Sequence, residues 1–188
     1  MKELTFATGN AHKLGEARAI LEGTGVTVLG YDGPEPVESG VSFLENALIK
    51  ARAAYQATGK PSFADDSGIA VEVMGGAPGI FSAIWSGTRS DQVNRDLLLA
   101  QLIDIPAEHR ACSFVCTVAL VSDKGEVSFT GIWSGRVAFE SAGTGGFGYD
   151  PIFIPEGFEV TAAELDKEVK NAYSHRSLAL QQLANYLS

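Results

Sequence analysis

Apolar residues occur along this chain at two alternating spacings, and the alternation predicts an α/β fold. Helical spacing marks four segments: one between Asn10 and Gly23, one after Ser42, one over 91–103 and one after Ser174. Short apolar runs rich in β-branched residues lie between these segments and predict strands. The order of elements therefore begins strand, tight turn, helix, and continues with strands and helices interleaved.

The predicted helices carry recognisable end signals and apolar stripes. Asn10 is a predicted N-cap, and Ser42 and Glu45 have the spacing of a capping box, which makes the second helix the most secure. The capping box accounts for Glu45, so this residue needs no functional role. The residues that we expect to face the core are Leu44, Leu48, Ala51 and Tyr55 in the second helix, and Val93, Leu97, Leu98 and Leu102 in the third.

The strand predictions indicate a mixed sheet. They cover 4–8, 26–31, 61–66, 69–74, 111–121 and 126–133. Ser67-Gly68 is interpreted as a turn between two of them, and Ser122-Asp-Lys-Gly125 as a hairpin turn between the last two. An antiparallel hairpin in a chain with strand–helix alternation predicts a mixed α/β sheet in a single domain over residues 1–188, since no repeat or linker divides the chain.

Composition and charge narrow the function classes. The chain has 188 residues, 45% hydrophobic and 20% charged, which is typical of a globular domain with a real core. Its net charge of −9 argues against a nucleic-acid partner, yet leaves room for a small anion bound by a few cations. No apolar run predicts a signal peptide or a membrane span, so we expect a cytoplasmic protein without a membrane partner.

Two cysteines, Cys112 and Cys116, lie on one predicted strand. Four strand residues span about 13 Å, which is too far for a disulfide between them. Nothing nearby completes a set of metal ligands. We therefore expect two free core thiols.

Three cationic or titratable residues lie in the first turns of predicted helices. Lys13 follows Asn10, and His175 and Arg176 follow Ser174, although helix N-termini favour negative charge. Each side chain alone could simply extend into water. Because two helices make the same exception, the pattern favours an anion, such as phosphate, bound by helix amides and cations together.

A glycine-rich segment, GTGGFGYDP at 143–151, is a second candidate site. It matches the dinucleotide-binding glycine pattern by accident, because Tyr149-Asp-Pro151 prevents the helix that such a motif requires. The segment is either a tight structural loop or a base pocket. In the second case exposed rings of Phe147 and Tyr149 would stack on a base, and Asp150 would accept a ring N–H.

Carboxylates form the third candidate group. Adjacent strand residues point to opposite faces, so Asp65 and Asp66 cannot both face one site. One of the two, together with Glu38 from the Pro/Gly-rich loop, suits Mg²⁺, which takes one or two carboxylates plus phosphate and water oxygens. The other Asp supports the first or caps the Ser67-Gly68 turn.

Five segments together resemble the inosine triphosphate pyrophosphatase family. They are FATGNAHK, ESGVSFLENALIKA, FADDSGIAVEVMGGAPGIFSA, GTGGFGYDPIFIP and AELDKEVKNAYSHR, and they occur in the family's order over most of the chain. The resemblance implies Mg²⁺-dependent hydrolysis of non-canonical purine nucleoside triphosphates (ITP, dITP, XTP) to the monophosphate and pyrophosphate. It also implies a homodimer with an elongated mixed sheet and two lobes flanking an active-site cleft.

The resemblance assigns roles to individual positions of this chain. It implies metal binding by Glu38 and Asp66, with Asp66 as the proton acceptor for the attacking water. The positions that it matches to substrate contacts are Thr8, Gly9, Asn10, Lys13, Ser67, Phe147, Gly148, Tyr149, Asp150, Lys170, His175 and Arg176. Two positions depart from the family, because Ile84 stands where an arginine is usual and Val169 where a second acidic residue is common.

Two other classes of function stay open at this point. A catalytically silent module that senses purine triphosphates would use the same binding residues, and release of pyrophosphate from ITP distinguishes it from an enzyme. Salt-sensitive DNA binding would indicate a nucleic-acid-binding protein instead.

Overall fold

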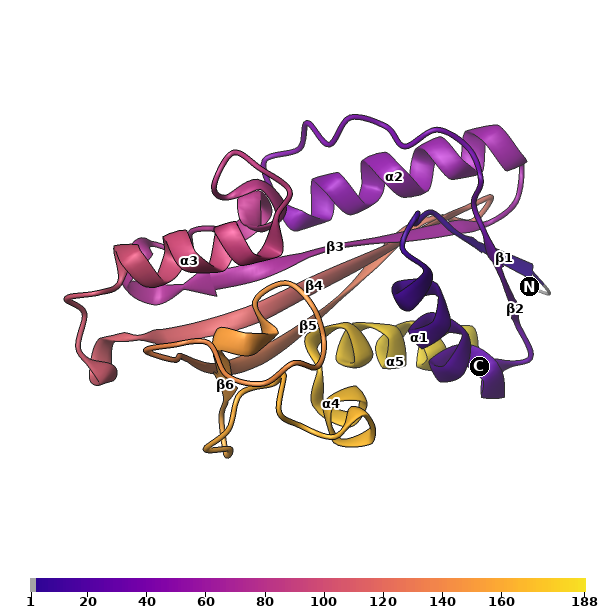
Figure 1. The fold of residues 1–188 in the computed structure, drawn as a ribbon. Helices are drawn as coiled ribbons and strands as arrows, with labels where there is room; N and C mark the ends of the chain where they lie inside the picture. Colours follow the sequence, from indigo (N-terminus) through magenta and orange to yellow (C-terminus); the bar gives the residue numbers. More distant parts are fainter. Residues whose placement is uncertain (1–2) are drawn as a thin grey trace. The chain divides into compact units, whose positions relative to one another are not determined.

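The computed structural model describes residues 3–188, and its six strands form one mixed sheet (Figure 1). The strands are β1 (Glu3–Phe6), β2 (Thr27–Gly30), β3 (Ser62–Val71), β4 (Ala111–Ser122), β5 (Gly125–Val137) and β6 (Phe153–Pro155). Their hydrogen-bonded order is β2-β1-β3-β4-β5-β6. β1 runs parallel to β2 and β3, whereas β6 is antiparallel to β5, which confirms the predicted mixed α/β sheet.

Four of the five α-helices match the predicted ones. The helices are α1 (Ala11–Leu21), α2 (Phe43–Thr58), α3 (Asp91–Gln101), α4 (Lys167–Tyr173) and α5 (His175–Leu187). The sequence did not predict α4, which has seven residues, all at least partly exposed, and hence no apolar stripe. Within residues 3–188, no helix has the length and apolar character needed to cross a bilayer.

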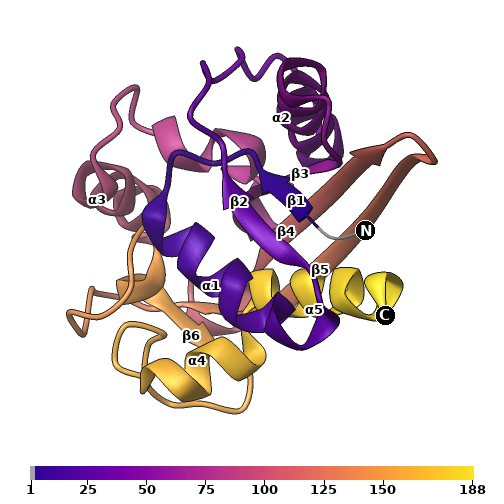
Figure 2. The same ribbon diagram turned by 90° about the vertical axis from the view of Figure 1, so that its right-hand side faces the viewer.

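The chain folds into two compact units, each with its own core. Unit 1 comprises the described part of Met1–Asp66 with Cys116–Gly131 and His175–Ser188. In it, α1 and α5 cover one face of the strands and α2 the other (Figure 2). The rings of Phe6 and Phe63 stack with centroids 4.3 Å apart at the centre of the larger core cluster.

Unit 2 comprises Ser67–Val115 and Ile132–Ser174. Its core contains Ile69, Leu98, Trp133 and Phe153 among others, under α3 and the strand segments of this unit. A buried arginine, Arg110, also belongs to it. Its guanidinium donates to the carbonyl oxygens of Leu102, Ile105, Val137 and Ala138 at 2.6–3.3 Å.

The predicted turn at Ser67-Gly68 is wrong, because β3 continues through both residues. Gly68 is needed there for packing and not for a bend. A Cβ at this position would collide with the carbonyl oxygen of Gly79 and the hydroxyl of Ser82. That hydroxyl accepts the Ile69 N–H at 3.0 Å and donates to the Gly79 carbonyl at 2.6 Å, so the 3₁₀ segment Gly79–Ile84 lies directly on the strand.

The predicted helix faces are partly wrong. In α2 the buried residues include Ala47, Ala51 and Ala54, whereas Leu44 is exposed. Small side chains on this face let the helix approach the strands closely, which an apolar-spacing rule does not detect. In α3 the buried positions include Leu98, with Leu102 buried just beyond the helix, while Val93 is exposed.

Two other expectations are confirmed. Ser42 accepts the Glu45 N–H at 3.2 Å, although the Glu45 carboxylate reaches one residue beyond the usual box partner, to the Val41 N–H at 2.9 Å. Cys112 and Cys116 are free, buried thiols on β4.

Replacing Gly68 by alanine tests the packing role of this glycine. We expect Gly68→Ala to lower the free energy of unfolding by about 1–3 kcal/mol, the usual cost of overpacking, as measured by urea denaturation. Gly23→Ala is the matched control, because an added Cβ there meets no described atom within 4 Å. Equal stability of the two variants would contradict the assignment.

Candidate active site

Consecutive aspartates on β3 face opposite layers of unit 1, as strand geometry predicts. Asp65 contacts Lys13 of α1 and Arg176 of α5. Asp66 contacts Asn46 and lies near Lys50, both from α2 on the other face. One strand thereby builds two different charged sites.

The Asp65 site is a buried ion cluster. Lys13 Nζ donates to the two carboxylate oxygens of Asp65 at 3.1 and 2.9 Å, and Arg176 Nε donates to Oδ2 at 3.2 Å. Burial alone would raise the pKa of Asp65, but the charges of Lys13 and Arg176 outweigh it and hold that pKa well below its usual range. Asp65 is therefore a permanent anion between two helices.

A second carboxylate completes this cluster and was missed in the sequence. Glu16 of α1 accepts from an Arg176 terminal nitrogen at 3.0 Å. Two cations and two anions thus balance within the cluster. The cations at the helix N-termini are stabilised by carboxylates of the chain itself, an explanation that helix-dipole reasoning alone did not supply.

Access to the two cations differs. The Lys13 side chain is 19% exposed, whereas that of Arg176 is 5% exposed. Lys13 can therefore contact a bound anion directly, while Arg176 mainly neutralises and holds Asp65. His175, the first residue of α5, is also buried.

The predicted N-terminal phosphate motif forms a hydrogen-bonded turn. The Asn10 side chain accepts the N–H groups of His12 and Lys13 at 2.9 and 3.3 Å, which confirms its predicted role as N-cap. Thr8 Oγ1 accepts the Asn10 N–H at 3.1 Å. The carboxylate of Glu35 accepts the Gly9 N–H at 3.1 Å, so an anionic group already lies on this turn.

The Asp66 site contains residues that sequence reasoning missed. Asn46 Nδ2 donates to Asp66 Oδ2 at 3.0 Å. Lys50 Nζ lies 2.6 Å from Glu38 Oε1 and 3.8 Å from Asp66 Oδ1. The available signal was Asn46 and Lys50 four residues apart, hence on one face of α2. Burial raises the pKa of Asp66, and Lys50 and Asn46 offset only part of this effect.

The predicted metal ligands, Glu38 and Asp66, both lie within reach of one ammonium group. Among residues 3–188, no group of three or more His, Cys, Asp or Glu side chains could hold a metal ion by itself. Two carboxylates nevertheless suit Mg²⁺, which commonly uses one or two protein carboxylates together with substrate phosphates and water. Lys50 now provides the positive charge between these two carboxylates.

The glycine-rich loop forms the candidate site of unit 2. Asp150 Oδ2 accepts the Phe147 N–H at 2.7 Å and binds Lys170 Nζ of α4 at 2.5 Å. Lys170 Nζ also lies 5.4 Å from the centre of the Phe147 ring. The structure thus brings together the aromatic ring and the carboxylate predicted for this segment and the cation of Lys170.

Tyr149 does not present an open face, contrary to the expectation that this loop exposes both aromatic rings. Tyr149 is 6% exposed and belongs to the core of unit 2, and its hydroxyl donates to the Ser82 carbonyl at 2.7 Å. Phe147 is 40% exposed. Stacking by this loop therefore rests on Phe147.

Gly148 is held by two α3 residues that the sequence did not reveal. Its N–H donates to Asp91 Oδ2 at 2.8 Å, and its carbonyl accepts from Arg95 at 2.6 Å. Of the other predicted positions, Ser67 follows Asp66 on β3 and is half-buried. Ile84, at the family's arginine position, is exposed at the end of the Gly79–Ile84 segment.

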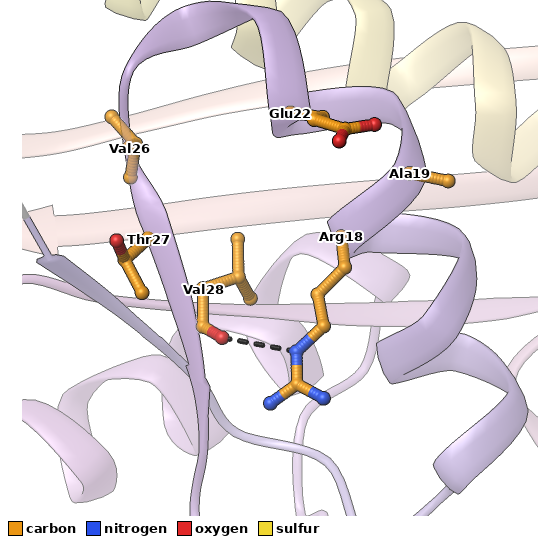
Figure 3. Close-up of a pocket in the computed structure, with 6 residues that line it drawn as sticks. All are labelled: Arg18, Ala19, Glu22, Val26, Thr27 and Val28. Atoms are coloured by element: carbon orange, nitrogen blue, oxygen red, sulfur yellow. Dashed lines mark hydrogen bonds between the residues drawn. The ribbon is translucent and has the colours of Figure 1, made fainter.

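A surface hollow between α1 and β2 lies apart from these predicted residues. Its lining includes Arg18, whose Nε donates to the Val28 carbonyl at 3.1 Å, with Glu22 and Val26 nearby (Figure 3). None of the predicted site residues lines it.

Comparison with known proteins identifies the family. The Ham1 family model matches residues 4–186. The chain belongs to the Ham1 family. This result confirms the family predicted from the five sequence motifs.

Relatives of this Ham1-family protein are similar over their full length. A protein of Leifsonia xyli subsp. xyli named dITP/XTP pyrophosphatase is 52% identical over 191 residues, covering 100% of this chain and 96% of that protein. One of Streptomyces coelicolor with the same name is 51% identical, covering 97% and 96%.

Solved structures share the fold of this Ham1-family protein. A HAM1 protein from Coxiella burnetii superposes with a TM-score of 0.93 at 39% identity, covering 100% of this chain and 98% of that one. A nucleoside-triphosphatase, or dITP/XTP pyrophosphatase, from Mycobacterium abscessus gives 0.81 at 47% identity, covering 96% and 98%.

Replacing Asp65 by asparagine tests the buried cluster. Removing one member of a buried ion pair leaves the other charges uncompensated, so we expect Asp65→Asn to lower the free energy of unfolding by about 3–5 kcal/mol at pH 7. A carboxyl with a depressed folded pKa stabilises above its unfolded pKa and loses this effect as pH falls toward the folded value. The difference between wild type and variant should therefore shrink below about pH 4.

Urea denaturation at pH 7 and pH 3 measures both effects. Glu126→Gln is the control, since its pair with Arg52 is exposed, and we expect a change below about 1 kcal/mol. An Asp65→Asn protein as stable as wild type at pH 7 would contradict the cluster's role.

Proposed function

We propose that this Ham1-family protein is an enzyme that hydrolyses non-canonical purine nucleoside triphosphates (ITP, dITP and XTP) to the monophosphate and pyrophosphate. The observation that carries the proposal is the Asp66 site, a buried carboxylate of raised pKa beside Glu38 and Lys50. Relatives named dITP/XTP pyrophosphatase, which are 52% and 51% identical to this chain over nearly their full length, support the choice of substrate.

In this proposal unit 1 provides the groups for the triphosphate. Lys13, partly exposed and next to the Thr8–Asn10 turn, contacts phosphate oxygens, and Arg176 holds the cluster in place from α5. When substrate binds, a phosphate oxygen replaces the Glu35 carboxylate as the acceptor of the Gly9 N–H. Backbone N–H groups at the start of a helix are favourable donors to phosphate. Ser67, which follows Asp66 on β3 and is the first residue of unit 2, is a further proposed substrate contact through its hydroxyl.

Asp66 accepts the proton of the attacking water. The side chain is buried beside α2, and the Asn46 amide fixes one of its oxygens, so the carboxylate is held in one place. Glu38 and Asp66 would hold Mg²⁺ once Lys50 moves aside, and the ion would neutralise charge on the phosphates. Positioning and charge neutralisation are the main sources of catalysis in phosphoryl transfer.

Unit 2 provides the groups for the purine base. Phe147 offers a stacking face, and Gly148 and Tyr149 hold its loop. Lys170 donates to the 6-oxo group, and Asp150 accepts a ring N–H. His175 is a further proposed substrate contact. A pocket that donates at this position leaves a buried polar group unpaired when adenine enters, which costs about 1–3 kcal/mol.

Three wider expectations belong to the same proposal. Residues 1–188 act as one nucleoside triphosphate pyrophosphatase domain, the protein forms a homodimer, and it works in the cytoplasm without nucleic-acid or membrane partners. Support for the dimer comes from the family resemblance, and support for the absence of nucleic acid from the net charge of −9. A silent sensor is not favoured, because the relatives carry the name of an enzyme.

Replacing Asp66 by alanine tests the proposed function. We expect Asp66→Ala to lower the turnover of ITP by about 10³-fold, the typical contribution of a general base, while ITP binding persists. Wild type should release pyrophosphate and not orthophosphate, and should prefer ITP over ATP by about 10- to 100-fold in kcat/KM, which matches the cost of about 1–3 kcal/mol. The measurement is a panel of canonical and deaminated triphosphates with both phosphate products quantified.

Asp96→Ala is the control, because Asp96 is exposed on α3 and its removal should leave turnover unchanged. Near-normal activity of Asp66→Ala would refute the role of Asp66. Binding of ITP without turnover by wild type would favour the sensor.

A further inference from the structure

Two side chains on successive turns of α3 bind the same residue of the glycine-rich loop. Asp91 Oδ2 accepts the Gly148 N–H at 2.8 Å, and Arg95 donates to the Gly148 carbonyl at 2.6 Å. Residues four apart lie on one face of a helix, so α3 presents an acceptor and a donor together. Both backbone polar groups of Gly148 are satisfied by this pair.

The contact restrains Arg95 as well as the loop. Its Nε is buried and has no hydrogen-bond partner among residues 3–188, so the bond to Gly148 is the one described hydrogen bond of this guanidinium. Leaving a buried donor unsatisfied is unfavourable. Arg95 therefore differs from a surface cation that only contacts water. Its guanidinium is held in place by the bond to the loop.

Gly148 is the point at which this loop changes from core to surface. It has a left-handed φ of 60°, which favours glycine. On its C-terminal side Tyr149 is fixed in the core through Ser82. On its N-terminal side Phe147 is partly exposed and donates its N–H to Asp150. Rotation about Gly148 would move the Phe147 ring relative to Asp150 and Lys170.

We propose that Asp91 and Arg95 are positioning residues for purine recognition, which act by clamping Gly148. The clamp keeps the Phe147 ring at a fixed place relative to the Asp150–Lys170 pair, so that one flat base can stack and hydrogen-bond at once. Neither residue touches the substrate. The inference rests on the proposed function, since it assigns the loop to the base.

Four substitutions and one control separate the clamp from general stability. Asp91→Asn and Asp91→Ala both remove the charge from the first turn of α3, but only asparagine retains an acceptor for the Gly148 N–H. Arg95→Lys retains a donor, and Arg95→Leu does not. Asp96→Ala, an exposed change on the same helix, is the control.

The first measurement is amide hydrogen exchange of Gly148, followed by NMR. We expect exchange about tenfold faster in Asp91→Ala than in Asp91→Asn, and Asp91→Asn close to wild type. Equal exchange in the two variants would overturn the clamp. This result is independent of enzymatic activity, so it holds even if the protein does not hydrolyse ITP.

The second measurement is steady-state kinetics with ITP and ATP. In Asp91→Ala and Arg95→Leu we expect KM for ITP to rise about tenfold with kcat within about twofold, and the preference for ITP over ATP to fall. Asp91→Asn and Arg95→Lys should restore most of the wild-type KM for ITP and most of the preference for ITP over ATP. The inhibition constant of pyrophosphate, which reports on the proposed phosphate-binding residues of unit 1, should not change.

A uniform loss of kcat with every substrate, or unchanged preference for ITP, would overturn the positioning role. If wild type shows no ITP turnover, the proposed function fails instead, and the exchange measurement alone decides whether Gly148 is clamped.

Discussion

A β-strand turns successive side chains to opposite faces, and in unit 1 this constraint separates Asp65 from Asp66. Asp65 lies with Lys13 and Arg176 under α1 and α5, and Asp66 lies with Asn46 and Lys50 under α2. Both carboxyls are buried but their pKa values shift in opposite directions, because Lys13 and Arg176 outweigh the effect of burial on Asp65, whereas Lys50 and Asn46 offset only part of it on Asp66. Asp65 therefore pairs with cations from two helices, and Asp66 is the carboxylate to which we assign proton transfer in the proposed function.

Charged side chains held by complementary groups also occur in unit 2. Lys170 pairs with Asp150, and Arg95 and Asp91 bind both sides of Gly148. Because these contacts already restrain the loop, the proposed binding of a base would cost little further conformational entropy. Side chains of α3 and α4 thus hold the glycine-rich loop through hydrogen bonds and an ion pair.

Much of the fold follows from the sequence, since caps, apolar periodicity and the hairpin depend on local physics. Asn10 and Ser42 cap helices as predicted. Gly68 was wrongly predicted to form a turn. A glycine is needed there because of a tertiary contact with Ser82, and rules based on neighbouring residues do not detect such a contact. Tyr149 was placed outside for a similar reason, and Lys50 and Arg95 were missed because ordinary helix-surface cations look the same in sequence.

The division of labour between the two aspartates is the central claim, and metal titration tests it directly. Mn²⁺ binding, followed by electron paramagnetic resonance, would be measured with a non-hydrolysable α,β-imido ITP analogue for Asp65→Asn and Asp66→Asn. We predict that Asp66→Asn weakens Mn²⁺ binding by at least about tenfold and leaves nucleotide affinity near wild type, whereas Asp65→Asn weakens nucleotide affinity more than metal affinity. If both variants lost the same affinity, for Mn²⁺ or for the nucleotide, to an equal extent, the result would contradict the account.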